Sequence, residues 1–195
     1  MMTEDVAGYV DRYFSDLSDA LSKVDRGTIE NMVGLLMDCY EGEHTIYICG
    51  NGGSGATASH IVCDFNKGIS MYHEKKFRML CLNDNIPSIL AISNDCSYDD
   101  LFLMQVEGRI REGDVLIAIS GSGNSHNIVR VADYFRSCGN KVIGFSGYSG
   151  GKLSEMSDIS VHVPINDMQK SEDSHMIILH LCAQIIANKL GHPMC

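Results

Sequence analysis

The chain has 195 residues, of which 45% are hydrophobic and three are proline, a composition typical of one globular domain. Its formal net charge of −10 argues against a nucleic-acid groove or an anionic membrane surface as partner, because both attract a basic stripe. No apolar run approaches the length of a membrane span and the N-terminus does not resemble a secretory signal, so we expect a cytoplasmic protein.

Two amphipathic helices are predicted first, at residues 6–21 and 29–40. The first has a stripe of apolar residues that includes Val6, Val10 and Phe14. Because no strand precedes these helices, we interpret residues 1–40 as an N-terminal helical arm that buries its stripe against another subunit. Packing of the stripe on its own domain stays open, since it would also remove these residues from water.

Helices and strands alternate through the rest of the chain. We predict strands at residues 45–49, 78–82, 115–119, 141–145 and 159–162, and helices at residues 53–67, 86–92, 99–107, 125–137 and 172–190. Such alternation predicts a doubly wound α/β fold with a five-stranded parallel sheet and helices on both faces. Ligands of such folds bind at the carboxyl ends of the strands.

Two of the loops that follow predicted strands have the composition of phosphate-binding turns. Residues 47–55 read YICGNGGSG, and residues 115–125 read VLIAISGSGNS. A helix that begins at such a loop presents unpartnered N–H groups and the positive end of its dipole, and both favour an anion. Neither loop fits the dinucleotide or the Walker motif, and either loop alone could be a tight turn without a ligand. Two such loops on one sheet predict a phosphorylated ligand.

Ionisable residues on two predicted helices form a second candidate group. His60 and Asp64 are four residues apart and therefore share a helix face, while Glu172 and His180 lie in a very apolar helix. Their nitrogen and oxygen atoms suit zinc, nickel or iron, or an acid–base pair. Each residue also has an alternative role, as a surface hydrogen bond, a core histidine or a residue that stabilises the helix dipole.

The spacing of Glu172 and His180 limits how they can act together. Eight residues correspond to about 12 Å along a regular helix, so one straight helix cannot bring both side chains to one ion. Either Glu172 belongs to the helix cap, with Ser171 as the capping residue, or one of the two side chains comes from a neighbouring subunit.

Five motifs follow one another along the chain: GNGGS at residues 50–54, HIVCD at 60–64, SND at 93–95, SGSGNS at 120–125 and EDSHMIILH at 172–180. Their order and spacing resemble the sugar-isomerase (SIS) superfamily, and within it the sedoheptulose 7-phosphate isomerases. The resemblance covers essentially the whole chain and implies a single SIS domain over residues 1–195. It also implies a homotetramer with active sites at subunit interfaces, which makes D-glycero-D-manno-heptose 7-phosphate, the first step toward nucleotide-activated heptose.

The resemblance also implies roles for individual residues. The substrate would be bound by Asn51, Gly52, Gly53, Ser54, Asn94, Asp95, Ser120, Gly121, Ser122, Ser125 and Glu172, with the phosphate on the two loops and Asp95 on the sugar hydroxyls. Asp64 and His180 would be the catalytic acid and base. Some members bind a divalent metal, zinc, through the positions that match His60, Asp64, Glu172 and His180.

Three departures from the family pattern leave the substrate open. Asp64 replaces the usual glutamate, Glu172 replaces the usual glutamine, and Lys67 is the nearest cation to a missing arginine. An isomerase of another phosphosugar is therefore an alternative. A non-catalytic SIS adaptor of the replication initiator is a second one, although such a protein would not need Asp64 and His180.

Overall fold

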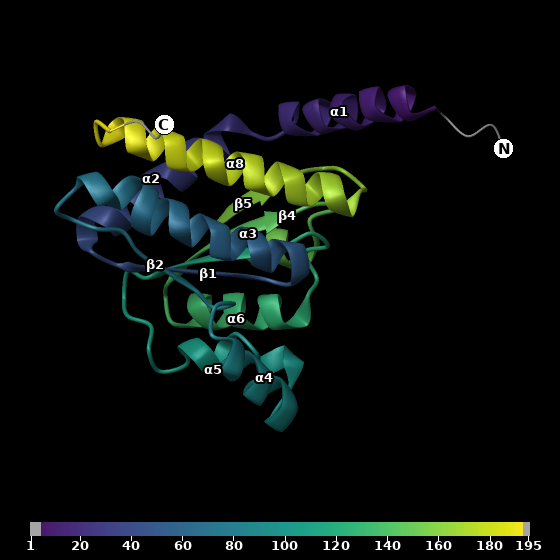
Figure 1. Ribbon diagram of the computed structural model, residues 1–195. Coiled ribbons are helices and arrows are strands. Elements are labelled where there is room, and N and C mark those ends of the chain that lie inside the picture. Colours follow the sequence, from purple (N-terminus) through teal and green to yellow (C-terminus); the bar gives the residue numbers. More distant parts are fainter. Residues whose placement is uncertain (1–4, 193–195) are drawn as a thin grey trace.

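The computed structural model describes residues 5–192 of the chain. Its one sheet has the strand order β2-β1-β3-β4-β5, and all neighbouring strands are parallel. The strands are β1 (Thr45–Gly50), β2 (Arg78–Cys81), β3 (Val115–Ser120), β4 (Lys141–Ser146) and β5 (Ile159–His162). The predicted doubly wound α/β fold is confirmed (Figure 1).

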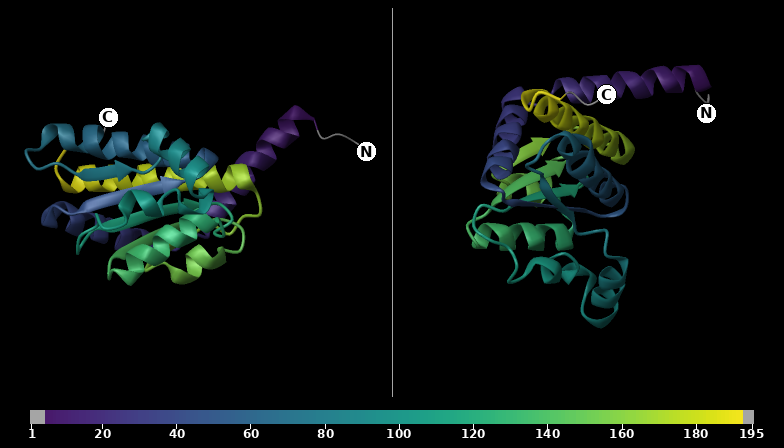
Figure 2. Two further views of the ribbon diagram at one scale, coloured as in Figure 1. Left: turned by 90° about the horizontal axis from the view of Figure 1, so that it is seen from below. Right: turned by 60° about the vertical axis from the view of Figure 1, so that its left-hand side comes forward.

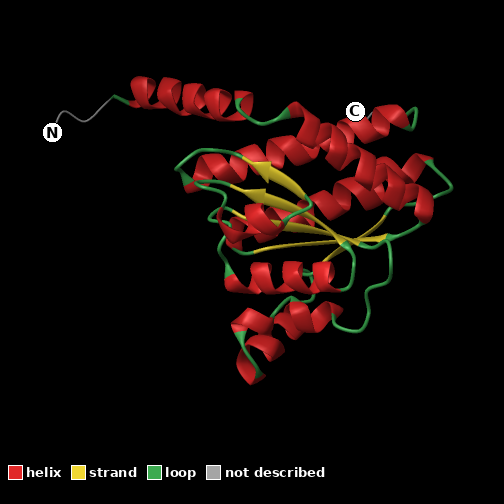
Figure 3. Ribbon diagram, turned by 180° about the vertical axis from the view of Figure 1, so that it is seen from behind, coloured by secondary structure: helices red, strands yellow, loops and turns green. Residues whose placement is uncertain are grey.

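Helices cover both faces of the sheet (Figures 1 and 3). On one face α2 (Arg26–Gly42), α3 (Gly52–Cys63) and α8 (Met168–Lys189) share an apolar core with the strands. On the other face α5 (Leu103–Val106), α6 (His126–Ser137) and α7 (Gly151–Met156) enclose a second core. The residues of β3 are all buried, which explains why its sequence is an unbroken apolar run.

Several helices differ from their predicted bounds. The predicted helix at 53–67 is α3 followed by a π-helical turn (Asp64–Ile69), and the one at 86–92 extends as α4 (Ile86–Asp95). A 3₁₀ turn (Ser70–Tyr72) follows the π turn. The predicted helix at 99–107 consists only of a second 3₁₀ turn (Tyr98–Asp100) and the short helix α5. Helix α7 was not predicted.

The last helix begins four residues before its predicted start. Asp167 caps α8, because its carboxylate accepts a hydrogen bond of 3.1 Å from the backbone N–H of Lys170. The predicted cap at Ser171 is therefore wrong: the Ser171 hydroxyl lies inside the helix and donates to the carbonyl of Asp167. Glu172 is consequently a residue of the helix and not of its cap.

Helix α1 (Val6–Ser22) extends away from the domain (Figure 2). Val6, Val10 and Phe14 are 82%, 42% and 65% exposed. Helix α2 instead buries Met32 and Leu36 in the main core. The projecting arm is thus α1 alone and shorter than the predicted residues 1–40, because the apolar face of α2 packs on its own domain. None of the helices within residues 5–192 combines the length and hydropathy of a bilayer crossing.

Candidate active site at the carboxyl edge of the sheet

The two glycine- and serine-rich loops lie next to each other. They follow β1 and β3, which are hydrogen-bonded neighbours with Gly50 opposite Ile119. The chain continues from β1 to β2 on one side and from β3 to β4 on the other, so this point is the topological switch of the sheet. Folds with this strand order bind ligands in the crevice at the switch point.

The helices that follow the two loops lack a capping bond from their N-cap side chains, although in α6 the N–H of Ile128 donates to Asn127 Oδ1 at 2.9 Å. Side-chain carboxylates or amides cap α1, α2, α4 and α8, whereas the N-cap residues of α3 and α6, Asn51 and Ser125, make no side-chain capping bond. Backbone N–H groups that lack a side-chain cap are available to an anion. This feature supports the predicted phosphate site at these two helix starts.

The side chain of Asn51 joins the two loops instead of capping α3. Asn51 and Asn127 exchange two hydrogen bonds of 2.9 Å, and the hydroxyl of Tyr98 donates to Asn51 Oδ1 at 3.0 Å. Within the second loop, Ser120 Oγ donates to Ser125 Oγ at 3.1 Å. Asn127 was not predicted, although it lies only two residues after the serine motif, and no sequence signal marks Tyr98.

Glu172 lies against the start of α3. A Cβ atom built on Gly53 would lie 2.3 Å from Glu172 Oε2, so only glycine leaves room for this carboxylate. A carboxylate at a helix N-terminus is favoured by the dipole and also occupies part of the space that an anion would use. Of the other predicted residues nearby, Ser54 is buried, and Ser122 Oγ accepts a bond from the N–H of Asn124.

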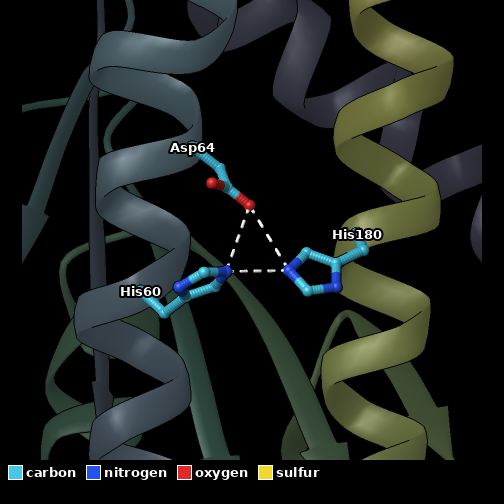
Figure 4. A group of neighbouring side chains, drawn as sticks. All are labelled: His60, Asp64 and His180. Carbon is cyan, nitrogen blue, oxygen red and sulfur yellow. Dashed lines mark hydrogen bonds and ion pairs between the residues drawn. The ribbon is translucent and has the colours of Figure 1, made fainter. Parts of the chain in front are cut away.

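Further along α3 and α8, three side chains converge (Figure 4). His60 Nε2 and His180 Nε2 are 2.9 Å apart, and Asp64 Oδ2 lies 3.5 Å from the first and 3.4 Å from the second. His60 and His180 are 49% and 42% exposed, so the cluster is open to solvent on one side. The predicted association of His60, Asp64 and His180 across two helices is therefore present in a single chain.

The three side chains suit a divalent metal ion. One ligand atom from each lies within 4.8 Å of the others. Ligands at 2.0–2.1 Å in a tetrahedral arrangement around zinc are about 3.3 Å apart, close to the distances observed here. Two imidazoles and one carboxylate leave a coordination position for a substrate or a further ligand.

Glu172 is not part of this cluster within one chain. Its carboxylate contacts Gly53, seven residues before His60 on α3. Since helices rise 1.5 Å per residue, the two positions are about 10 Å apart along the helix. The possibility that Glu172 curls toward the cluster from the helix cap is therefore wrong, and only a neighbouring subunit could supply it there.

Asn94 and Asp95 are followed three residues later by Tyr98, whose hydroxyl bonds to Asn51 of the first loop, but neither residue has a described contact with the loops. They end α4, which buries none of its residues, and Asn94 Nδ2 donates to Asp95 Oδ1 at 2.7 Å. No described contact joins Asp95 to either glycine loop. The structure of one chain thus places Glu172 beside the first loop at one end of α3 and the histidine cluster at the other end.

Comparison with known proteins identifies the family. The family model described as SIS domain matches residues 12–147. A phosphoheptose isomerase of Aliarcobacter butzleri is 35% identical over 164 residues, which are 84% of this chain and 86% of that protein. Among solved structures, a phosphoheptose isomerase from Francisella tularensis matches with a TM-score of 0.87, 26% identity and coverage of 95% of this chain and 100% of that one.

A phosphoheptose isomerase from Neisseria gonorrhoeae matches nearly as well, with a TM-score of 0.85, 27% identity and coverage of 94% and 97%. These likenesses extend over α8 and its His180, which lie beyond the residues matched by the family model. The chain therefore belongs to the SIS-domain family, and within it to the phosphoheptose isomerases.

Proposed function

We propose that the protein converts sedoheptulose 7-phosphate into D-glycero-D-manno-heptose 7-phosphate, the first step toward nucleotide-activated heptose. The observation that carries this proposal is the arrangement along α3, which begins at a glycine-rich loop without a side-chain cap and ends at the cluster of His60, Asp64 and His180. The two regions are about 12 Å apart along the helix, a separation that suits an elongated sugar phosphate bound at both ends.

The reaction requires one proton to move between two neighbouring carbons of the sugar. Where no metal holds their facing atoms, Asp64 and His180, 3.4 Å apart, are the acid–base pair that removes the proton from one carbon and returns it to the other. The loops around Asn51 and Ser120 bind the phosphate away from the reacting carbons, so that binding energy orients the carbonyl end.

His60, Asp64 and His180 would hold a divalent ion, which we propose to be zinc. A metal bound there polarises the carbonyl oxygen of a sugar as a Lewis acid. Glu172 lies against Gly53 of its own chain, so it would have to leave that position to supply a fourth ligand to the cluster of a neighbouring subunit. The metal content of the purified protein distinguishes a ligand role from a proton-transfer role for Asp64 and His180.

The enzyme acts as a homotetramer in the cytoplasm, with its active sites at subunit interfaces. The exposed apolar face of α1 and the open side of the histidine cluster support an assembly that covers them. Asp95 and Asn94, at the exposed end of α4, would bind sugar hydroxyls.

The proposal is tested by incubating the purified protein with sedoheptulose 7-phosphate and following aldose formation, before and after chelation and after zinc is added back. We expect turnover that chelation abolishes and zinc restores. Asp64 and Glu172 depart from the family pattern, so turnover is also measured with a panel of other ketose phosphates. Faster turnover of another sugar would identify that phosphosugar as the substrate. Absence of product from every sugar, with or without divalent metal, would contradict the isomerase assignment and favour the adaptor.

A further inference from the structure

The first turns of α8 lie directly against both phosphate loops. A Cβ built on Gly53 would lie 2.3 Å from Glu172 Oε2, and one built on Gly121 would lie 2.7 Å from Met168 Sδ. A Cβ built on Gly147 would lie 2.3 Å from Ser171 Oγ, and the N–H of Gly147 donates to the carbonyl of Gly121 at 2.8 Å. The position of this one helical segment therefore affects the shape of both loops.

Helix α1 also contacts the first turns of α8, through side chains other than those that face the loops. Lys170 Nζ lies 2.7 Å from Asp16 Oδ2 of α1 and 3.3 Å from Asp167 Oδ2 of the α8 cap. The Lys170 ammonium also lies 5.0 Å from the ring centroid of Tyr13. The hydroxyl of Tyr13 donates a hydrogen bond of 2.5 Å to Asp173 Oδ2.

The lysine in these contacts is largely shielded from solvent. The side chain of Lys170 is only 11% exposed, and lysine is rarely so buried unless it is paired. Removing one partner of a buried ion pair leaves an uncompensated charge. The bond to Asp173 raises the pKa of Tyr13 to about 12, so the phenol stays a proton donor at any physiological pH.

We propose that Tyr13 and Lys170 are positioning residues for sugar-phosphate binding, because they fasten the first turns of α8 against the loops that receive the phosphate. The packing of α1 on α8 is then coupled to the affinity of the loops for an anion, through Met168, Ser171 and Glu172. The inference rests on the proposed function only for the identity of the loops as a phosphate site.

Tyr13→Phe tests the coupling with the smallest change, the loss of one hydroxyl. Tyr9→Phe is the matched control, because it removes a tyrosine hydroxyl of the same helix that has no described partner on α8, and it keeps the apolar ring that the proposed interface would cover. We measure the Kd of inorganic phosphate by calorimetry, and KM and kcat with sedoheptulose 7-phosphate. For Tyr13→Phe the phosphate Kd and KM should both rise about fivefold, in the range of coupling between linked sites, with kcat nearly unchanged. Tyr9→Phe should match the wild type.

Lys170→Met should weaken phosphate binding in the same way, and Lys170→Arg should restore most of it, since arginine can still pair with Asp16 and Asp167. Should Lys170→Met fail to fold, Tyr13→Phe decides alone. An unchanged phosphate Kd in Tyr13→Phe, even with a lower melting temperature, would overturn the inference, as would a wild type that does not bind phosphate. Phosphate binding that responds to Tyr13→Phe without any turnover of the sugar would support the inference and contradict the proposed function.

Discussion

At the scale of single residues, the chemistry of this protein centres on His60, Asp64 and His180. Each residue alone would be unremarkable, since a histidine and a carboxylate four apart are common on helix surfaces. Their Nε2 and Oδ2 atoms nevertheless meet within 3.5 Å across two helices. Because His60 and His180 bring two basic nitrogens face to face, the cluster suits a shared proton or a metal ion better than two independent imidazoles.

Replacing His180 with glutamine should abolish turnover while leaving phosphate binding nearly intact. The imidazole acts at the reacting end of the sugar, about two turns of helix from the loops, and loss of an acid–base group costs about 10²- to 10⁴-fold in kcat. His192→Gln is the matched control, because His192 stacks on Tyr72 beyond the end of α8. Turnover that survives in His180→Gln would remove His180 from the mechanism.

His175 makes stability depend on pH. Its ring is fully buried beside Phe145, and burial lowers its pKa to about 4, with a further contribution from nearby His162. The unfolded chain therefore binds a proton at this histidine near pH 6.5, whereas the folded chain binds it only near pH 4. The free energy of unfolding consequently falls as the pH falls from about 6.5 toward 4. We expect the free energy of unfolding to fall by about 2 kcal/mol between pH 7 and pH 5 because of His175.

Urea unfolding of the wild type and of His175→Gln at both pH values isolates this contribution. The variant lacks the titrating ring, so its stability should fall less than that of the wild type over the same interval. Equal losses in the two proteins would show that other groups cause the acid sensitivity.

At the scale of elements, α3 is specialised at both of its ends. Its N-terminus lacks a side-chain cap, and its C-terminus passes into a π turn that begins at Asp64. Within this turn Asn66 exchanges two hydrogen bonds, of 2.8 and 3.1 Å, with the backbone of Met79 on the edge strand β2. Single π turns recur at functional sites because they shift which face a side chain occupies. Here the turn begins at the proposed catalytic carboxylate.

The first turn of α3 should be sensitive to the smallest added side chain. Gly53→Ala places a methyl group where Glu172 now lies, so Glu172 must move, although alanine favours the helix by about 0.5–1 kcal/mol over glycine. We expect a protein that folds normally while its KM rises about tenfold, the equivalent of one lost charge-assisted contact.

Gly34→Ala in α2 is the control for this variant, because a Cβ there meets nothing within 4 Å. It should gain similar helix stability and keep its KM. An unchanged KM in Gly53→Ala would show that the position of Glu172 does not matter to substrate binding.

At the scale of the whole molecule, one chain leaves large apolar side chains exposed on α1 and on either side of His180. Val6, Tyr9, Val10 and Phe14 line one face of a projecting helix. Ile177 and Leu181, on the two sides of His180 in the sequence, are 40% and 42% exposed. Surfaces of this kind are usually covered by a partner, which agrees with the proposed tetramer and with active sites at its interfaces.

Phe14→Glu should therefore weaken assembly, because it would bury a charge in the proposed interface. Light scattering after size exclusion should show species smaller than the wild-type oligomer, and activity should fall with the loss of oligomer. Ser15→Glu, an exposed change on the opposite face of α1, should leave the mass unchanged. A wild-type monomer, or a Phe14→Glu variant of unchanged mass, would contradict the role of α1 in assembly.

Local rules in the sequence determined the sheet, the order of its elements and the two loops. A buried parallel strand needs a continuous apolar run and a close turn at Gly50 needs glycine, so both features are visible without a partner in space. The same rules misplaced the start of α8, since Ser171 and Asp167 are both acceptable caps and only the course of the chain after β5 selects Asp167.

Tertiary structure alone decided which distant side chains meet. His60 and His180 are 120 residues apart, and their contact depends on how α3 and α8 pack on one face of the sheet. The same packing places Glu172 on Gly53 instead of in the histidine cluster, and it draws α2 into the core while α1 stays outside. Periodicity shows that a helix has an apolar face, but the surface that covers this face is set by the packing of the whole chain.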